Sequence, residues 1–597
     1  MLRDKDLVAI QEARAKVEKA YAAFQQYRRF TQEQVDAVID RMAQAGRSNA
    51  ERLARLAVEE TGYGNVHDKT SKNLLCCDTL HQAIRPLKTV GIIREDAAQK
   101  LIEIAEPVGV VAAILPTTNP TSTALFKILI ALKGRNTIVI SPHPRAVRCT
   151  CETAALLYQA AREAGAPEDL IQCLESPTLE ATQEIMRHRR TGVILSTGGQ
   201  GIVRAAYSSG KPALGVGPGN VPVMLERSAE VKQAVRMVVE GKSFDYGTVC
   251  SSEQSLVAEE SLRQQVLAEL KANHAHLCDE GQIAALSKLL ITPDFRVNPK
   301  CVGQAPTEIA RMAGFSVLPE TRILVAHLEG MGKQYPLSAE KLSPVLSLYF
   351  VKDFEAGAQL CENLLHFGGL GHTCVIYSRD DARIREFGLR MPAMRVLVNT
   401  PAPQGSVGIT TNVFPSMTLG CGAAAGNVTG DNIGPLHLIN WKRIAYHVRD
   451  AEEAFVSPEA KAYFATGRVA EAAAPAPEPA SVPPRPAIAA AVERYLASRG
   501  LGAAPPPAAA NPAAEVVDRF LASRPPGSPS GPAAAAGPQN PAPCASPPAP
   551  PVEVASFVSE ADVRQARREG KKIYLGRKTI VTPAARDVGA GILVETD

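Results

Sequence analysis

Short apolar runs and helix patterns alternate along the first 450 residues. The runs "VGVVAAIL" (108–115), "NTIVISPHP" (136–144) and "TGVILSTGG" (191–199) each have the length of a buried strand and lead into a loop. The segment "STALFKILIALKGR" (122–135), between two of them, is typical of a helix with an apolar face. Strands that alternate with helices form a parallel sheet with helices on both faces, and ligands bind at the carboxyl ends of the strands. We therefore predict an α/β fold.

Composition argues against nucleic acid, membrane and metal partners. The net charge is only +4 over 597 residues, and Lys and Arg form no tract. No apolar run approaches the ~18 residues of a membrane span, and the N-terminal segment lacks the apolar core of a signal peptide. We expect a cytoplasmic protein. The twelve cysteines form no CxxC pair, and the one CxC, Cys149 and Cys151, has no histidine cluster nearby, so we expect no metal site.

The chain changes character near residue 470. Proline and alanine dominate 456–555, and such a composition buries too little apolar surface to fold, so we predict a disordered linker. Two segments within it, at about 487–501 and 513–524, repeat each other at an offset of 25 residues. A last segment, 556–597, begins with a helix that Ser559 can cap.

The repeated segments share one apolar helical face. The matching pairs are Val492 and Val517, Tyr495 and Phe520, and Leu496 and Leu521. An isolated helix of about twelve residues is marginal in water, so we predict that these helices dock onto a partner. The alternative is a fortuitous alanine-rich helix. For 556–597 we expect a strand or hairpin around Gly576 and a role in interaction, since about forty residues make a poor core alone.

Two loops at predicted strand ends carry candidate site residues. The first follows the strand at 191–197 and opens a helix; its residues are Ser196, Thr197, Gly198, Gly199 and Gly201. Backbone amides at a helix N-terminus suit a pyrophosphate, although such a loop can also simply make a tight turn. The second, "LPTTNPT" (115–121), contains Asn119, whose amide can donate to a developing oxyanion or can cap a helix.

Cys250 differs from the other cysteines in its surroundings. It lies in "FDYGTVCSSEQ" (244–254), among small and polar residues. Most cysteines of soluble proteins are inert core residues. A nucleophilic cysteine needs space around its sulfur and a backbone amide at the reacting centre, and "GTVCSS" provides both.

Taken together, these segments resemble the aldehyde dehydrogenase superfamily, and more closely its CoA-acylating branch. The resemblance covers residues 1 to about 450 and rests on "EPVGVVAAILPTTNPTSTALFKILIALKGRNTIVISPHPRA", "STGGQGIVRAAYSSGKPALGVGPGNVPV", "SFDYGTVCSSEQ", "EKLSPVLSLY" and "GGLGHTCVIYS". It implies a Rossmann-like cofactor domain at 1–225, a catalytic domain at 226–425 and a return to the cofactor domain, or oligomerisation segment, at 426–455.

The resemblance also implies roles for individual residues. Cys250 matches the nucleophile, and Asn119 the oxyanion-hole amide. The glycine loop at 196–201 matches the pyrophosphate contact, and Glu340 the acid that holds the nicotinamide ribose. Pro116 and Thr117 are expected beside the cofactor.

Two departures from the hydrolytic members of the family bear on the reaction. Those members carry a water-activating glutamate about 35 residues before the nucleophile, where this chain has Gly215. Glycine accepts no proton, whereas a thiol with a pKa near ~8.5 is partly ionised without help, so coenzyme A is favoured over water. On this interpretation, Gly215→Glu increases hydrolysis if the loop tolerates the side chain. The second departure is Ser141, where hydrolytic members commonly have a lysine for the adenosine ribose; His143 and Arg145 are candidate substitutes. We expect NAD, with NADP possible.

The resemblance implies oxidation of a short aliphatic aldehyde, propionaldehyde or acetaldehyde, with NAD and coenzyme A to an acyl-CoA. Related enzymes of bacterial microcompartments carry short helices on Pro/Ala-rich linkers, so the repeated helices are expected to bind shell proteins and to place the enzyme in the microcompartment lumen. A homodimer or homotetramer is expected. The alternatives are a hydrolytic aldehyde dehydrogenase, which Gly215 disfavours, and a scaffolding protein with an inactive dehydrogenase body, which intact Cys250, Asn119 and Glu340 disfavour.

Overall fold

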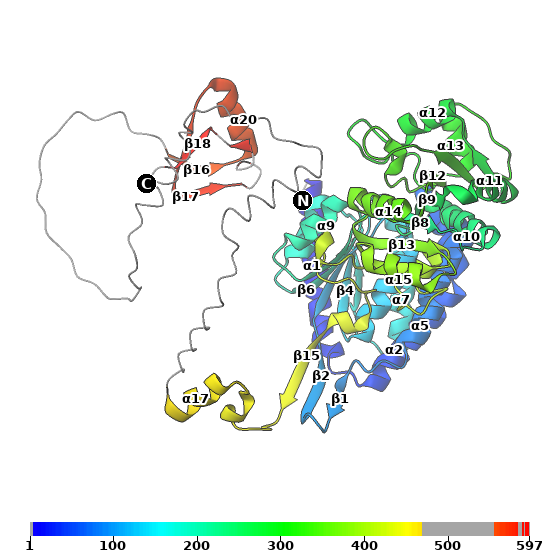
Figure 1. Cartoon of the computed structure of the whole chain (residues 1–597). Helices are drawn as coiled ribbons and strands as arrows, with labels where there is room; N and C mark the ends of the chain where they lie inside the picture. The colour runs from blue at the N-terminus through cyan, green and yellow to red at the C-terminus, as the bar shows by residue number, and fades with distance from the viewer. Residues whose placement is uncertain (1–3, 468–553, 583–584, 586–587, 590, 596–597) are drawn as a thin grey trace, which may run out of the picture. The chain divides into compact units, whose positions relative to one another are not determined.

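The computed structural model describes residues 4–467, 554–582, 585, 588–589 and 591–595. The chain divides into two compact units, Met1–Ala472 and Ala473–Asp597 (Figure 1). Most of the predicted linker at 456–555, including the repeated segments, lies outside the described residues.

A five-stranded parallel sheet in the order β5-β4-β3-β6-β7 forms the first half of the first unit. Its strands are β3 (Val110–Ile114), β4 (Thr137–Ser141), β5 (Ile171–Cys173), β6 (Thr191–Thr197) and β7 (Ala213–Val216). Side chains of a strand alternate between faces. Accordingly, Val111 and Ala113 pack into one apolar cluster, whereas Val110 and Ala112 pack into a second cluster.

Helices supply the other side of both clusters. They are α1 (Lys5–Tyr27), α2 (Gln32–Ser48), α3 (Ala50–Thr61), α4 (Val66–Leu74), α5 (Leu80–Ile84), α6 (Pro120–Lys133), α7 (Val147–Glu163), α8 (Leu179–Arg187) and α9 (Gln200–Tyr207). The clusters separate them by face: α2, α6 and α7 contribute to one, and α1 and α8 to the other. The sheet is therefore covered on both sides.

Helix α6 is buried along its whole length rather than on one face. Even Lys127 is buried, and its ammonium nitrogen donates to the backbone oxygens of Ile114 and Leu195 at 2.8 and 2.9 Å. Burial holds the pKa of Lys127 well below its usual value. Because Ile114 ends β3 and Leu195 lies near the end of β6, this side chain ties together two strand ends that lead into the candidate site.

A seven-stranded sheet in the order β10-β11-β12-β9-β8-β13-β14 forms the second half, and all its pairs are parallel. The strands are β8 (Val221–Leu225), β9 (Glu253–Glu259), β10 (Ala275–Leu277), β11 (Ile323–His327), β12 (Val345–Val351), β13 (Gly371–Tyr377) and β14 (Ala393–Val398). The accompanying helices are α10 (Val231–Ser243), α11 (Arg263–Ala272), α12 (Glu280–Leu290), α13 (Pro306–Met312), α14 (Phe354–Gly368), α15 (Asp381–Arg390) and α16 (Ala402–Ser406). The chain passes from one sheet to the other between β7 and β8, near the predicted boundary at residue 225.

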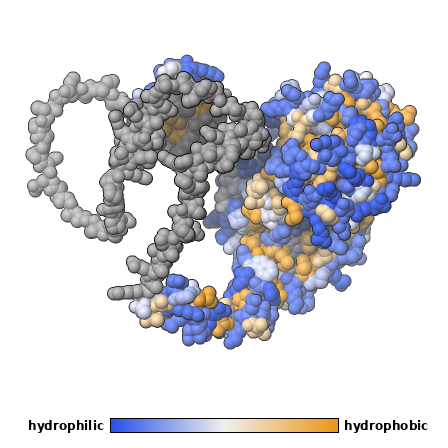
Figure 2. All heavy atoms as spheres, in the orientation of Figure 1, coloured by the Kyte–Doolittle hydropathy of each residue, from blue (hydrophilic) through white to orange (hydrophobic). Residues whose placement is uncertain are grey.

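Three antiparallel strands form a separate sheet in the order β1-β2-β15. They are β1 (Gly91–Asp96), β2 (Leu101–Pro107) and β15 (Ile439–Ala445). The chain thus returns to the first half after the second sheet is complete. Helix α17 (Pro458–Thr466) ends the described part of the first unit. Apolar side chains interrupt the hydrophilic surface of this unit (Figure 2).

The second unit contains a small parallel sheet in the order β16-β17-β18 and one helix. The elements are β16 (Val554–Val558), α20 (Glu560–Glu569), β17 (Ile573–Val581) and β18 (Leu593–Glu595). Ser559 caps α20 as predicted, with Asp562 completing a capping box. Gly576 lies inside β17, and both neighbours of β17 are parallel, so the segment is a strand and not a hairpin.

The predicted α/β fold is confirmed. Among the described residues, no helix combines the length and apolarity that a bilayer crossing needs.

Candidate active site

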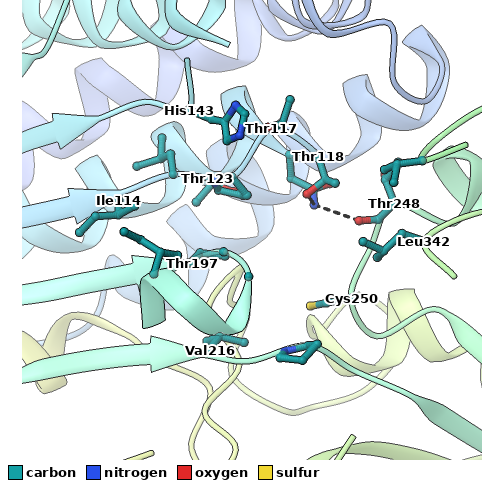
Figure 3. Close-up of a pocket in the computed structure, with 18 of the residues that line it drawn as sticks. Ile114, Thr117, Thr118, Thr123, His143, Thr197, Val216, Thr248, Cys250 and Leu342 are labelled. Atoms are coloured by element: carbon teal, nitrogen blue, oxygen red, sulfur yellow. Dashed lines mark hydrogen bonds between the residues drawn. The ribbon is translucent and has the colours of Figure 1, made fainter. Parts of the chain in front are cut away.

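A cavity of about 630 Å³ opens at the carboxyl ends of β3, β4, β6 and β7. The predicted residues that line it are Pro116, Thr117, Asn119, Ser141, His143, Thr197, Gly198, Gly199, Cys250 and Glu340. Thr117, Thr118 and Thr197 approach it from the first half of the unit, and Thr248, Cys250 and Leu342 from the second (Figure 3). Four predicted residues, Ser196, Gly201, Gly215 and Arg145, do not line this cavity.

Cys250 follows a turn of unusual backbone conformation. Asp245 and Tyr246 both have positive φ, 47° and 52°, which non-glycine residues rarely adopt. Buried contacts hold Asp245 in place: its carboxylate pairs with Lys69 at 3.0 Å and with Lys72, and it accepts from Thr248. The strained turn is thus fixed by an ion-pair network that directs the following residues, Thr248 to Cys250, into the cavity.

His372, at the start of β13, contacts the Cys250 sulfur. Its Nε2 lies 3.3 Å from Sγ, and its Nδ1 lies 3.0 Å from Oγ1 of Thr373. Burial lowers the pKa of His372 to about 3 and, together with the Glu340 charge, raises the pKa of Cys250 to about 12. At neutral pH, therefore, a neutral thiol faces a neutral imidazole. The imidazole is the base nearest to the thiol proton.

The Asn119 side chain does not cap a helix. It stands at the N-cap of α6 but makes no cap hydrogen bond. Instead, Nδ2 donates to the Thr248 carbonyl at 3.3 Å, shown as a dashed line in Figure 3, and Oδ1 accepts from the Lys72 ammonium. The Lys72 contact fixes which way the amide points, because an ammonium can only donate. The donor end of Asn119 consequently points to Thr248, two residues before Cys250, and also donates to the Thr118 hydroxyl at 3.1 Å.

The glycine loop presents open backbone at the end of β6. Gly199 is the N-cap of α9, and a Cβ added at Gly199 or Gly201 would meet no atom within 4 Å. Oγ1 of Thr197 and Oγ of Ser196 are buried and have no hydrogen-bond partner among the described residues. Free donors beside a helix N-terminus fit the pyrophosphate of a dinucleotide, and no bulky side chain stands in the way at these two glycines.

Glu340 is the one carboxylate among the residues that line the cavity. Its Oε1 accepts from the Gly219 backbone at 3.1 Å, and burial raises its pKa to about 7. Gly215, by contrast, lies in β7 against α9. A Cβ there would come within 2.8 Å of Val203 and 3.0 Å of the Tyr207 ring. A side chain at this position would therefore meet α9.

Ser141, His143 and Arg145, which are predicted at the adenosine end of the site, have different surroundings in the structure. The Ser141 hydroxyl hydrogen-bonds Thr182 at 2.8 Å, so it joins β4 to α8. His143 lines the cavity and is exposed. Arg145 donates to the Tyr63 hydroxyl at 3.0 Å, and Tyr63 itself lines the cavity. Arg145 thus reaches the site through Tyr63.

Sequence reasoning missed His372 and Lys72. His372 lies within the segment "GGLGHTCVIYS", which carries part of the family resemblance, and it is 122 residues from Cys250. Lys72 lies in a helix pattern and is 47 residues from Asn119. A histidine at the start of a buried strand was the available signal for His372. No group of three or more His, Cys, Asp or Glu side chains in the described part of the chain could hold a metal ion.

Residues 7–283 match the aldehyde dehydrogenase family. The bifunctional aldehyde-alcohol dehydrogenase AdhE of Escherichia coli K12 is 43% identical over 441 residues, which are 73% of this chain and 49% of that protein. The succinate-semialdehyde dehydrogenase (acetylating) of Clostridium kluyveri is 36% identical over 436 residues, 73% of this chain and 96% of that protein. The chain spans about half the length of the aldehyde-alcohol dehydrogenases that it matches.

Solved structures of aldehyde dehydrogenases also match this chain. An acetylating aldehyde dehydrogenase from Geobacillus thermoglucosidasius matches with a TM-score of 0.74 and 49% identity, over 75% of this chain and 99% of that one. A propionaldehyde dehydrogenase from the fucose utilisation bacterial microcompartment of Clostridium phytofermentans matches with a TM-score of 0.67 and 26% identity, over 73% and 97%. The chain belongs to the aldehyde dehydrogenase family, which confirms the resemblance seen in the sequence.

Proposed function

We propose that this protein oxidises a short-chain aldehyde, with NAD and coenzyme A as co-substrates, to an acyl-CoA. The observation that carries the proposal is that Cys250 contacts His372 and lines a cavity that Asn119 and the open glycine loop also line. The acetylating relatives from Clostridium kluyveri and Geobacillus thermoglucosidasius support it.

The residues suggest how the reaction proceeds. As the Cys250 sulfur attacks the aldehyde carbon, its proton passes to His372, 3.3 Å away, and from this weak base to solvent. The carbonyl oxygen, now negative, accepts from Asn119 Nδ2 and from the Cys250 backbone amide. NAD, which the glycine loop at 196–201 and Glu340 would hold, would supply the hydride acceptor that converts the adduct on Cys250 to a thioester. The thiol of coenzyme A then attacks this thioester. The Cys250 sulfur leaves as a thiolate as the acyl-CoA forms, and the proton lost by coenzyme A restores the Cys250 thiol.

The nature of the acceptor follows from what surrounds the thioester. Hydrolysis needs a base that activates water, whereas a thiol needs less help because more of it is ionised at neutral pH. Gly215 provides no such base, Glu340 is occupied by the Gly219 amide, and burial makes His372 a weak base with a pKa of about 3. We therefore favour coenzyme A over water, and an active enzyme over an inactive scaffold.

The substrate, the cofactor and the cellular setting are proposed from the relatives and from the sequence. Propionaldehyde or acetaldehyde is proposed as the substrate from the resemblance and from the propionaldehyde dehydrogenase relative. NAD is preferred over NADP, although His143 and Arg145 leave NADP possible. The Pro/Ala-rich segment with its repeated helices suggests binding to shell proteins and residence in a microcompartment lumen, the setting named for one structural relative.

One assay separates the three candidate functions. NADH formation is followed with an aldehyde series from two to five carbons, with and without coenzyme A, and the products are identified as acyl-CoA or free acid. Strict dependence on coenzyme A with acyl-CoA as product supports the proposal. Equal NADH formation without coenzyme A would indicate the hydrolytic enzyme, and no NADH with any aldehyde would indicate the scaffold.

A further inference from the structure

Two thiols face each other at the edge of the five-stranded sheet. Cys151 lies in the first turns of α7, and Cys173 ends β5, the edge strand. Their sulfur atoms are 2.7 Å apart, and both are free thiols on half-buried residues. The S–S bond of a disulfide is about 2.05 Å long. Only a small movement of α7 or of the strand end therefore separates the dithiol from a disulfide.

The two thiols differ in their electrostatic surroundings. The Lys16 ammonium of α1 donates to the Cys173 carbonyl and lies 3.0 Å from Glu12 and 3.1 Å from Glu175. A hydrogen bond from Cys173, with the Lys16 charge, lowers the pKa of Cys151, whereas burial raises the pKa of Cys173. Cys151 is thus the thiol more easily ionised. It is the better attacking group in thiol–disulfide exchange.

We propose that Cys151 and Cys173 form a reversible dithiol–disulfide site that reacts with small disulfides. The Cys151 thiolate attacks one sulfur of the small disulfide, forms a mixed disulfide and releases one thiol. The Cys173 sulfur then attacks Cys151 Sγ, the second thiol leaves, and the two protons lost by the protein end on the released thiols. The protein is oxidised by two electrons and the small disulfide is reduced to two thiols.

The site is separate from the proposed chemistry at Cys250 but adjoins its cavity. Cys173 precedes Pro177 by four residues, and Pro177, Thr178 and Leu179 line the cavity. Closing the bond would anchor the start of this wall to α7. The most direct consequence is a more rigid edge of the five-stranded sheet, which should raise the melting temperature of the protein.

The test uses the full-length, fully reduced protein treated with oxidised glutathione under native conditions. After the remaining thiols are blocked, trypsin places Cys151 in peptide 149–162 and Cys173 in peptide 163–187. We expect these two peptides to be linked, with a mass two hydrogen atoms below their sum. Cys151→Ser and Cys173→Ser should each abolish the link, and Cys173→Ser should leave glutathione on Cys151, the attacking thiol. Cys149→Ala, in the same peptide, should retain it.

Melting temperature provides a second measurement. The linked protein should melt about 5 °C above the reduced protein, and a reductant should reverse the change. Cys149→Ala should show the same rise and Cys151→Ser none. Glutathione found on Cys250 or Cys278 while the pair remains unlinked would overturn the proposal. So would a link that forms only in denaturant, or one that leaves the melting temperature unchanged or lower.

Discussion

At the scale of single residues, Cys250 is the side chain on which the proposed chemistry depends. Cys250→Ala removes the only atom that can form the covalent intermediate, so acyl-CoA formation should fall below the detection limit while the circular dichroism spectrum stays unchanged. Cys278→Ala is the matched control, because Cys278 is also half-buried but does not line the cavity. If Cys250→Ala kept a tenth of wild-type turnover, the nucleophile would lie elsewhere.

Glu340 has opposite effects on stability and on the proposed cofactor contact. Burial raises its pKa to about 7, compared with about 4.3 for an exposed glutamate. Because the folded form holds this proton more tightly than the unfolded chain, the stability it contributes is complete below about pH 4.3 and is lost as the pH rises through 7. At pH 8 Glu340 is ionised, and its buried charge lowers the free energy of unfolding.

Glu340→Gln should therefore increase the free energy of unfolding at pH 8 by on the order of 1–3 kcal/mol and change it little at pH 4. The same variant should raise the NAD concentration needed for half-maximal rate, since an amide is a poorer acceptor for a ribose hydroxyl. Urea unfolding at both pH values checks the first effect and steady-state kinetics the second. An equal change in stability at the two pH values would show that burial of the Glu340 charge is not the cause.

The sequence drew attention to single candidate residues but not to the contacts between them. Cys250 and Asn119 stood out because small residues and strand-end loops are local signals, and both line the cavity. The contacts of Lys72 with Asn119 and of His372 with Cys250 join segments far apart in the chain. Such contacts depend on how helices and strands pack, and no local pattern encodes them.

At the scale of elements, the packing of α9 on β7 changes the expected effect of a glutamate at residue 215. The sequence alone suggests that Gly215→Glu increases hydrolysis. In the structure, a Cβ at Gly215 meets Val203 and Tyr207 of α9, and the Tyr207 hydroxyl also holds the Gly215 backbone amide at 2.9 Å. A side chain there would displace α9, the helix that begins in the glycine loop.

We therefore expect Gly215→Glu to lower the free energy of unfolding by about 1–3 kcal/mol through overpacking, and to weaken NAD binding without raising free-acid formation. Gly217→Glu is the useful comparison, because Gly217 lines the cavity and a Cβ there would meet no atom within 4 Å. Product analysis of both variants is the measurement. Increased free acid from Gly215→Glu alone would favour the sequence interpretation instead.

The β1-β2-β15 sheet leaves β15 as an edge strand with exposed apolar side chains. Trp441 is 40% exposed and Ile444 42%, and Tyr446, which follows the strand, is 56% exposed. An edge strand also presents unpaired backbone groups, which another chain can pair. The proposed homodimer or homotetramer would cover both features.

The double variant Trp441→Lys/Ile444→Lys should therefore shift the protein towards monomer in light scattering at micromolar concentration. The reason is that it places two charges in the area that a subunit interface at this edge would bury. Leu389→Lys on α15 is the control: Leu389 is 91% exposed but lies on a helix surface. A wild-type protein that is already monomeric, or a double variant that keeps its oligomeric state, would show that this edge is not the interface.

At the scale of the whole molecule, composition distinguishes the Pro/Ala-rich segment from the part of the chain that contains the cavity. The composition changes near residue 470, and the chain divides into its two units after Ala472. Alternating strands and helices sufficed to predict the two-sided parallel arrangement. They did not predict the order of the strands, nor that β17 pairs with parallel neighbours on both sides, because strand order depends on long-range contacts.

The predicted apolar faces around Tyr495 and Phe520 should contribute binding rather than rate, because they belong to the Pro/Ala-rich segment and the residues that line the cavity all precede it in the chain. Burying three such side chains yields roughly 4–8 kcal/mol before the cost of ordering the helix, which leaves a weak contact for each copy. Two copies per chain, multiplied by subunits, would compensate through avidity.

Truncation after Gly467, where α17 ends, should therefore keep the aldehyde and coenzyme A kinetics within about twofold while releasing the enzyme from purified shells in a co-sedimentation assay. The double variant Tyr495→Glu/Phe520→Glu should release it equally, which separates loss of the apolar faces from loss of length. A truncated enzyme that still sedimented with shells, or that lost activity, would assign the tail another role.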